Sequence, residues 1–116
     1  MFGNTRANKK IIPMDKKEAV QKVRKYSNLV KNHFPVKMVI LYGSYAKSKA
    51  RKDSDIDVAV IVDETNKDFL TSEVELYKLR RNIDIRIEPI LLEKNNDESG
   101  FLEQILKEGL VVYSKE

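Results

Sequence analysis

The sequence predicts a single α/β domain, and three observations support this prediction. First, 116 residues are enough to bury one hydrophobic core and no more. Second, 41% of the residues are hydrophobic and 34% are charged, which is the composition of a globular protein rather than a disordered or membrane-spanning one. Third, segments with helical periodicity alternate along the chain with segments typical of strands. This alternation is typical of α/β proteins.

The N-terminal part of the chain predicts an arm followed by a helix. Residues 1–13 are polar and basic and end at Pro13, so we expect a flexible arm before a domain over residues 14–116. Asp15 is a suitable N-cap for a helix that ends before Pro35. The apolar positions that recur at helical spacing are Val20, Val23, Leu29, Val30 and Phe34. The lysines between them predict a basic outer face.

The next segments predict two buried strands separated by a turn. Residues 37–42 form a short apolar run that closes on Gly43 and Ser44. We expect a short helix over residues 45–50. β-branched side chains then dominate residues 55–62, which predicts the second strand.

The second half of the chain predicts two more helices and two more strands. Apolar residues recur at helical spacing over residues 69–82, and residues 83–91 alternate with period two. The alternation places Asp84, Arg86 and Glu88 on the face opposite Ile83, Ile85 and Ile87. Because Pro89 lacks an amide donor, this strand is expected at a sheet edge. A helix over residues 101–108 and a strand over residues 110–113 complete the domain.

The composition limits the chemistry and the location of the protein. The absence of cysteine excludes disulfides, a thiolate nucleophile and a cysteine-ligated metal, and the single histidine excludes two-histidine zinc sites. The remaining carboxylates favour a hard ion such as Mg²⁺. No apolar run approaches the roughly 18 residues of a membrane helix. Because the N-terminus also lacks the apolar segment of a signal peptide, we expect a cytoplasmic protein without a membrane partner.

A Gly-Ser turn and a pair of aspartates form the most informative group of residues. The turn at Gly43 and Ser44 lets backbone amides approach a phosphate closely. Asp55 and Asp57 are two positions apart on a strand, so their side chains share a face and start about 7 Å apart. That separation allows them to share one or two Mg²⁺ ions.

We expect a third carboxylate from residues 83–91. If that strand lies beside residues 55–62, Asp84 joins the two aspartates on the polar face. Glu88 lies on the same face, about 6.6–6.8 Å further along, and is the second candidate. An Asp-x-Asp pair alone is more often a solvated strand face. Its combination with the turn and a third acid favours a metal site instead, because three carboxylates repel one another unless cations neutralise them.

Residues 43–62, GSYAKSKARKDSDIDVAVIV, resemble the signature of the nucleotidyltransferase superfamily that includes DNA polymerase beta. The shared pattern is Gly-Ser, ten residues, then Asp-x-Asp. The resemblance implies the nucleotidyltransferase fold, an α/β domain with a short mixed sheet flanked by helices. It also implies Mg²⁺-dependent chemistry, in which a hydroxyl attacks the α-phosphate of a nucleoside triphosphate and pyrophosphate leaves. The expected donor is ATP and the expected group is AMP.

The resemblance further implies the roles of individual residues. The implied catalytic and metal-binding residues are Asp55, Asp57 and Asp84. The residues implied to contact the triphosphate are Gly43 and Ser44. Lys47 stands where many minimal members carry arginine, and we expect it to contact the nucleotide as well.

The resemblance also suggests a partner. Minimal members are commonly paired with a helical HEPN protein and act as antitoxins that transfer AMP to a tyrosine of the toxin. One alternative is a subunit that modifies a small hydroxylated molecule, as antibiotic-modifying relatives do.

Charge distribution raises another alternative, a non-catalytic module that binds nucleic acid or an acidic partner. Residues 1–52 contain 14 basic and two acidic side chains, whereas residues 53–116 contain eight basic and 16 acidic ones. A basic helix face is more often solvated than a nucleic-acid site, so nucleic acid is not the expected partner. The sequence leaves the oligomeric state open.

Overall fold

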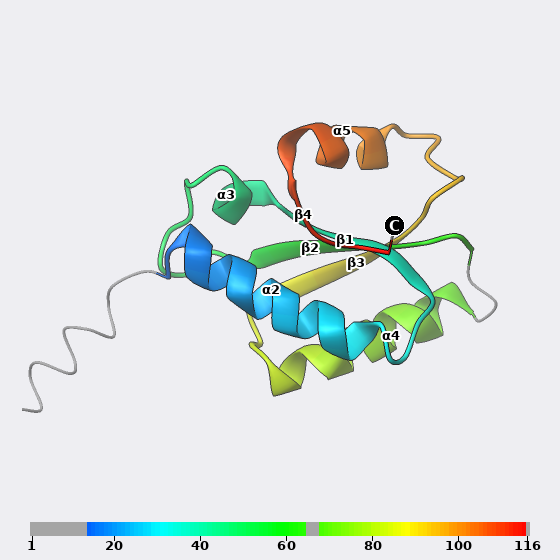
Figure 1. The fold of residues 1–116 in the computed structure, drawn as a ribbon, viewed down its shortest axis with the longest axis horizontal. Coiled ribbons are helices and arrows are strands. Elements are labelled where there is room, and N and C mark those ends of the chain that lie inside the picture. The colour runs from blue at the N-terminus through cyan, green and yellow to red at the C-terminus, as the bar shows by residue number, and fades with distance from the viewer. Residues whose placement is uncertain (1–13, 65–67, 116) are drawn as a thin grey trace, which may run out of the picture.

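The computed structural model describes residues 14–64 and 68–115, which form one mixed sheet with helices on both faces (Figure 1). The predicted N-terminal arm lies outside these residues. The helical elements are α2 (Lys16–Val30), α3 (Gly43–Ala46), α4 (Phe69–Leu79), the 3₁₀ turn η1 (Arg80–Asn82) and α5 (Phe101–Glu108). The strands are β1 (Val36–Tyr42), β2 (Ile56–Val62), β3 (Ile87–Glu93) and β4 (Leu110–Ser114).

The sheet has the strand order β3-β2-β1-β4. β1 is antiparallel to both β2 and β4, whereas β2 and β3 are parallel. A parallel pair needs a crossover connection, and α4 supplies it. β3 therefore lies at a sheet edge, as the position of Pro89 predicts.

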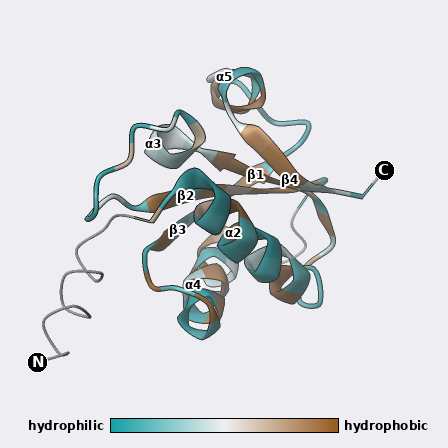
Figure 2. Cartoon of the chain, turned by 60° about the vertical axis from the view of Figure 1, so that its left-hand side comes forward, coloured by the Kyte–Doolittle hydropathy of each residue, from teal (hydrophilic) through white to brown (hydrophobic). Residues whose placement is uncertain are grey.

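Two apolar layers hold the helices on the sheet. Alternate residues of β2, from Ile56 to Val62, point into the larger core with α2 and α4, whereas Ala59 and Ile61 pack against α5. In Figure 2 the strands are largely brown between helices whose outer surfaces are mostly teal. Asp57 alternates with the residues of the larger core, so it lies on the α5 face of the sheet.

The predicted first helix is confirmed as α2. Asp15 accepts a hydrogen bond from the backbone N–H of Glu18 at 2.8 Å, and the two residues form a capping box. The buried side of the helix carries Ala19, Val23, Tyr26 and Val30. The Tyr26 hydroxyl donates to the Leu76 carbonyl at 2.7 Å, which joins α2 to α4.

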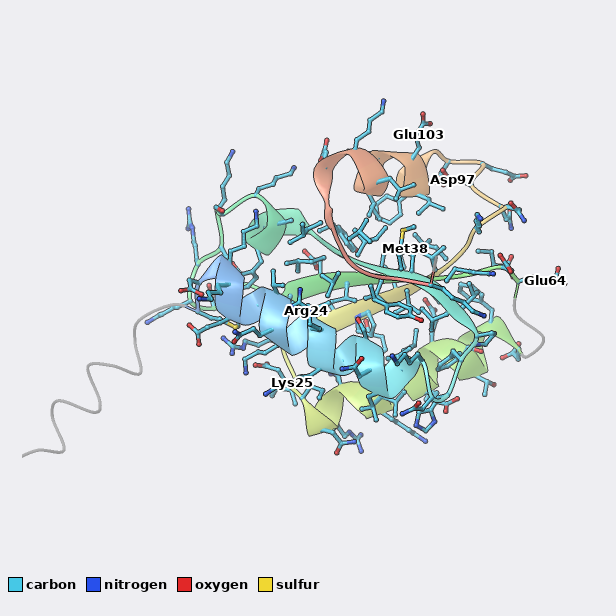
Figure 3. All side chains as sticks on the ribbon, viewed as in Figure 1. Arg24, Lys25, Met38, Glu64, Asp97 and Glu103 are labelled. Atoms are coloured by element: carbon cyan, nitrogen blue, oxygen red, sulfur yellow. The ribbon has the colours of Figure 1, made fainter. Side chains whose placement is uncertain are left out.

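An aspartate outside the helix fixes the start of α5. The carboxylate of Asp97 accepts hydrogen bonds from the backbone N–H groups of Leu102 at 2.8 Å and Glu103 at 3.0 Å. Figure 3 shows Asp97 and Glu103 together at this end of the helix. These bonds satisfy amides that have no partner within the helix.

The predicted strand over residues 83–91 begins too early. The backbone N–H groups of Ile83 and Asp84 both bond the Arg80 carbonyl at 2.9 Å, so the chain is still turning there. Strand pairing begins where the Ile56 N–H bonds the Arg86 carbonyl at 2.8 Å. The isoleucines at 83 and 85 therefore alternate without belonging to a strand. The short helix also starts earlier than predicted, at Gly43.

Within the part of the chain that the structure describes, no helix combines the length and the apolar character needed to cross a membrane.

Candidate active site

The turn at Gly43 brings the end of β1 against Asp57. Gly43 has a φ of +76°, a left-handed conformation that glycine adopts without strain. A Cβ atom at this position would collide with the Asp57 carboxylate. Glycine is therefore required here both for the backbone conformation and for the close approach. Ser44 follows in the first turn of α3 and is half-buried.

Asp55 and Asp57 stand at the start of β2. Asp55 is exposed just before the strand, and Asp57 is half-buried within it. Burial raises the pKa of the Asp57 carboxyl, and the neighbouring charges of Asp55 and Glu88 raise it further. These carboxylates therefore lie close enough to repel one another, which is the condition that a bound cation relieves.

Glu88 of β3 joins Asp57 because the two strands are parallel and in register. The two residues are direct partners in the β2–β3 ladder, and neighbouring strands are about 4.8 Å apart. Directly paired side chains emerge on the same face of a sheet. On the other side of Asp57 its partner is Tyr42, whose pKa is raised to about 12, first by burial and then by Asp57.

The structure does not bring Asp84 to this group. Asp84 lies in the turn before β3, and its carboxylate pairs with Arg86 at 2.8 Å and with Lys22 at 3.0 Å. The hydrogen bonds from Arg86 are the main reason why the pKa of Asp84 falls well below its usual range. Lys22 holds Asp84 against α2, and Arg86 pairs with it within the same turn. The geometry thus favours Glu88, the second candidate, as the acid beside Asp57.

Lys47 lies near the turn but already has a partner. Its Nζ atom is 3.1 Å from a carboxylate oxygen of Glu108 at the end of α5. Lys47 lines a cavity of about 170 Å³, whose other lining residues are Tyr42, Gly43, Phe101, Gln104, Ile105 and Glu108. Tyr42 and Phe101 meet edge to face in it, with ring centroids 5.9 Å apart. A cavity with aromatic and polar lining beside the turn can accept the flat part of a ligand.

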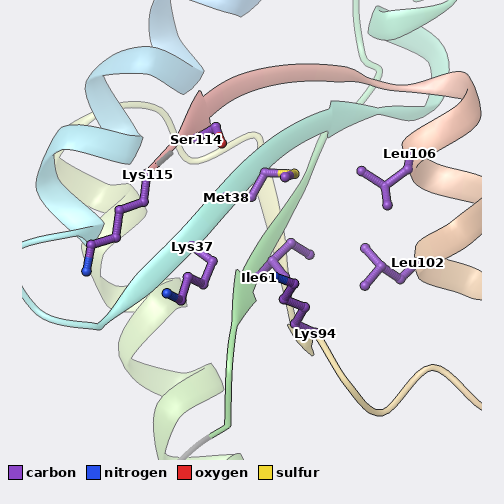
Figure 4. A pocket seen from close by; sticks show the side chains of 8 residues that line it. All are labelled: Lys37, Met38, Ile61, Lys94, Leu102, Leu106, Ser114 and Lys115. Atoms are coloured by element: carbon purple, nitrogen blue, oxygen red, sulfur yellow. The ribbon is translucent and has the colours of Figure 1, made fainter.

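A second cleft, of about 320 Å³, lies at the opposite end of the sheet (Figure 4). The start of β1 and the end of β2 line it with Met38 and Ile61, and α5 adds Leu102 and Leu106. Lysines 37, 94 and 115 stand around it. None of the residues that the sequence predicts for the site lines this cleft.

The donor set beside Gly43 suits a hard divalent ion. All its donors are carboxylate oxygens, which Mg²⁺ prefers. Among residues 14–64 and 68–115, no three histidine, cysteine or acidic side chains are grouped tightly enough to enclose an ion by themselves. Mg²⁺ is usually held by one or two carboxylates together with substrate phosphates, so an incomplete protein shell fits this ion.

Comparisons with known proteins show the family of the chain. The family model described as "Polymerase beta, Nucleotidyltransferase" matches residues 24–116. The protein adenylyltransferase MntA of Thermococcus cleftensis is 31% identical over 84 residues, which cover 72% of this chain and 80% of that protein. A Methanocaldococcus jannaschii protein, provisionally named a protein adenylyltransferase, is 28% identical over 90 residues, covering 77% of this chain and 88% of its own.

The fold is similar to that of solved structures. The chain matches a toxin-antitoxin structure with AMP-PNP at a TM-score of 0.63 and 22% identity, over 84% of this chain and 74% of that one. The matched fold is the nucleotidyltransferase fold that the sequence predicts. The chain therefore belongs to the polymerase beta nucleotidyltransferase family, and it is a nucleotidyltransferase.

Proposed function

We propose that this protein transfers AMP from ATP to a hydroxyl group of a partner protein and so acts as an antitoxin. The observation that carries the proposal is the group of carboxylates at Asp55, Asp57 and Glu88 beside the glycine turn. The names of relatives as protein adenylyltransferases support the reaction, and the toxin-antitoxin structure with AMP-PNP supports the nucleotide and the role.

In this proposal the chain's residues position the triphosphate and neutralise its charge. Gly43 and Ser44 contact the phosphates through backbone amides and a small hydroxyl. Lys47 contacts the nucleotide from the neighbouring cavity, which requires it to leave Glu108. Asp55, Asp57 and Glu88 do not enclose an ion by themselves, so they would hold Mg²⁺ together with the phosphates. The ion would screen the negative charge of the phosphates and of the leaving pyrophosphate. We assign Glu88 in place of Asp84 because Glu88 is the direct strand partner of Asp57, whereas Asp84 lies in the turn before β3 and pairs there with Lys22 and Arg86.

The reaction itself is a displacement at the α-phosphorus. The acceptor oxygen forms a bond to phosphorus while the bond to the bridging oxygen of the pyrophosphate breaks. The proton of the acceptor hydroxyl passes to a carboxylate, for which Glu88 is our assignment. Because positioning and charge neutralisation supply most of the catalysis of such reactions, this small set of residues is sufficient.

We propose a tyrosine of a helical HEPN-type toxin as the acceptor. The support is the resemblance to minimal nucleotidyltransferases and the toxin-antitoxin assembly of the structural neighbour. The experiment is incubation of the protein with Mg²⁺, ATP and the product of the adjacent gene. Intact-mass analysis of that product should then show the addition of AMP. If the partner stays unmodified although the nucleotidyltransferase in the same preparation binds ATP, the proposed transfer of AMP to the partner is contradicted.

The two candidates for the third acid give a matched pair of variants, Glu88→Gln and Asp84→Asn, and Asp57→Asn serves as a reference. We expect Asp57→Asn and Glu88→Gln to lower the rate of AMP transfer on the order of 100-fold or more, because each removes a charge that faces the reacting phosphates. Asp84→Asn should retain activity at temperatures where it is folded. Initial rates with labelled ATP measure all three. If neutralisation of the toxin survives the loss of Asp57 and Glu88, binding rather than transfer is the function.

A further inference from the structure

The carboxylate of Glu88 is held on both of its oxygens from outside the sheet. The Tyr77 hydroxyl of α4 donates to Oε1 at 3.1 Å, and the Arg80 guanidinium of η1 donates to Oε2 at 3.2 Å. Because β3 is an edge strand, these two side chains can reach around it from the helical layer. The carboxylate of Glu88 thus has two fixed hydrogen-bond donors, Tyr77 and Arg80.

Tyr77 and Arg80 also support each other. They are three residues apart on one helical run, so they lie on the same side of it. The Arg80 guanidinium lies over the Tyr77 ring, 4.8 Å from its centroid. Arg80 further donates to the carbonyls of Ile85 and Ile87, both at 2.9 Å. The arginine therefore has a fixed place relative to the start of β3.

The charges favour this arrangement. Glu88 and Asp57 repel each other across the two strands, and the positive charge of Arg80 offsets part of this repulsion. The Tyr77 hydroxyl and the Arg80 guanidinium each donate to one oxygen of the Glu88 carboxylate. Each carboxylate oxygen has a second lone pair, so these bonds leave room for a cation.

We propose that Tyr77 and Arg80 are positioning residues, which hold Glu88 in the orientation that binds the metal ion with ATP. The inference rests on the proposed function, because it concerns the same carboxylates. Hydrogen-bond partners that orient metal ligands commonly change metal affinity or activity about 10- to 100-fold when they are removed. Neither residue touches the phosphates in this proposal.

Tyr77→Phe is the sharpest variant because Tyr77 is 38% exposed and the change removes only the hydroxyl. We expect it to weaken the binding of Mn²⁺ in the presence of AMP-PNP about tenfold, measured by electron paramagnetic resonance of free Mn²⁺. Arg80→Gln should have at least the same effect. Arg81→Gln is the matched control, because Arg81 is the exposed neighbour in the same turn.

A double-mutant cycle separates positioning from a purely structural role. If Tyr77 acts through Glu88, Tyr77→Phe has no further effect on Mn²⁺ binding in a Glu88→Gln background. An equal loss in both backgrounds overturns the inference, as does Mn²⁺ binding by Tyr77→Phe that equals or exceeds that of the unmodified protein. Failure of the unmodified protein to bind Mn²⁺ and AMP-PNP together would instead contradict the proposed function.

Discussion

At the scale of single residues, two glycines with the same backbone conformation have different surroundings. Gly43 and Gly100 have φ values of +76° and +77°. A Cβ atom at Gly43 would meet the Asp57 carboxylate, whereas one at Gly100 would have nothing within 4 Å. The backbone conformation is therefore common to both positions, and of the two only Gly43 lies close to a carboxylate of the candidate site.

This difference predicts the behaviour of two alanine variants. Gly100→Ala should lower the free energy of unfolding by about 1–2 kcal/mol, the strain of a side chain in the left-handed region. Gly43→Ala should lower the free energy of unfolding by more than this. It should also abolish AMP-PNP binding, because the added methyl group displaces Asp57. Urea unfolding and calorimetric titration measure the two effects. Equal losses of stability with intact binding would show that the contact with Asp57 does not matter.

Asp84 predicts a pH dependence of stability. Its side chain is 9% exposed and paired with Lys22 and Arg86. Removing the charge by Asp84→Asn should cost about 2 kcal/mol at pH 7, since it weakens hydrogen bonds to charged groups. Because folding lowers the pKa of Asp84, the stabilisation is complete above the unfolded value of about 3.9 and is lost as the pH falls below it.

Urea unfolding of the two proteins at several pH values measures this dependence. The difference between the unmodified protein and Asp84→Asn should be constant near neutrality and should shrink only below about pH 4. A difference that stays the same at pH 3 would show that the carboxylate charge contributes nothing to the stability of the turn.

At the scale of elements, α4 is a helix with two buried positions, Ser72 and Leu76, and a broad exposed apolar surface. Leu76 is fully buried against the sheet and α2. Phe69, Leu70, Val74 and Tyr77 are all exposed by 38–67%. Hydrophobic type alone therefore does not say which residues of this helix face the core.

Matched substitutions on α4 test this assignment. Leu76→Ala should lower the free energy of unfolding by about 2–5 kcal/mol, because it removes a buried side chain and leaves a cavity. Leu70→Ala, at a position that is 67% exposed, should change it by less than about 0.5 kcal/mol. Urea unfolding of both variants gives the comparison. A large loss for Leu70→Ala would mean that this surface is covered in solution.

At the scale of the whole molecule, ion pairs connect the basic first half of the chain with the acidic second half. Among the described residues, three lysines of the basic half pair with acids of the other half. These pairs are Lys22 with Asp84, Lys37 with Asp63 and Lys47 with Glu108. Exposed pairs of this kind contribute little stability. The pair at Asp84, the most buried of them, fixes the turn that leads into β3.

Much of the fold follows from local sequence patterns. The period of the apolar residues and the cap at Asp15 predict α2, and the β-branched run after Asp55 predicts β2. These signals are local, because a helix or strand needs only a matching periodicity and suitable ends. The Gly-Ser turn and its spacing to Asp-x-Asp likewise predict the family, which the comparisons confirm.

The sequence by itself determined the family and most of the elements, and it predicted the aspartates of the candidate site, because each depends on residues near one another in the chain. Only the tertiary structure shows which acid lies beside Asp57. Asp84 and Glu88 occupy equivalent positions in the alternating pattern, but the chain is still turning at Asp84 and pairs with β2 only from Ile87 onward. Parallel register then places Glu88 beside Asp57, while Lys22 and Arg86 hold Asp84 elsewhere. The turn at Arg80 decides where pairing with β2 begins, and the alternation of residues 83–91 alone does not show where that turn ends.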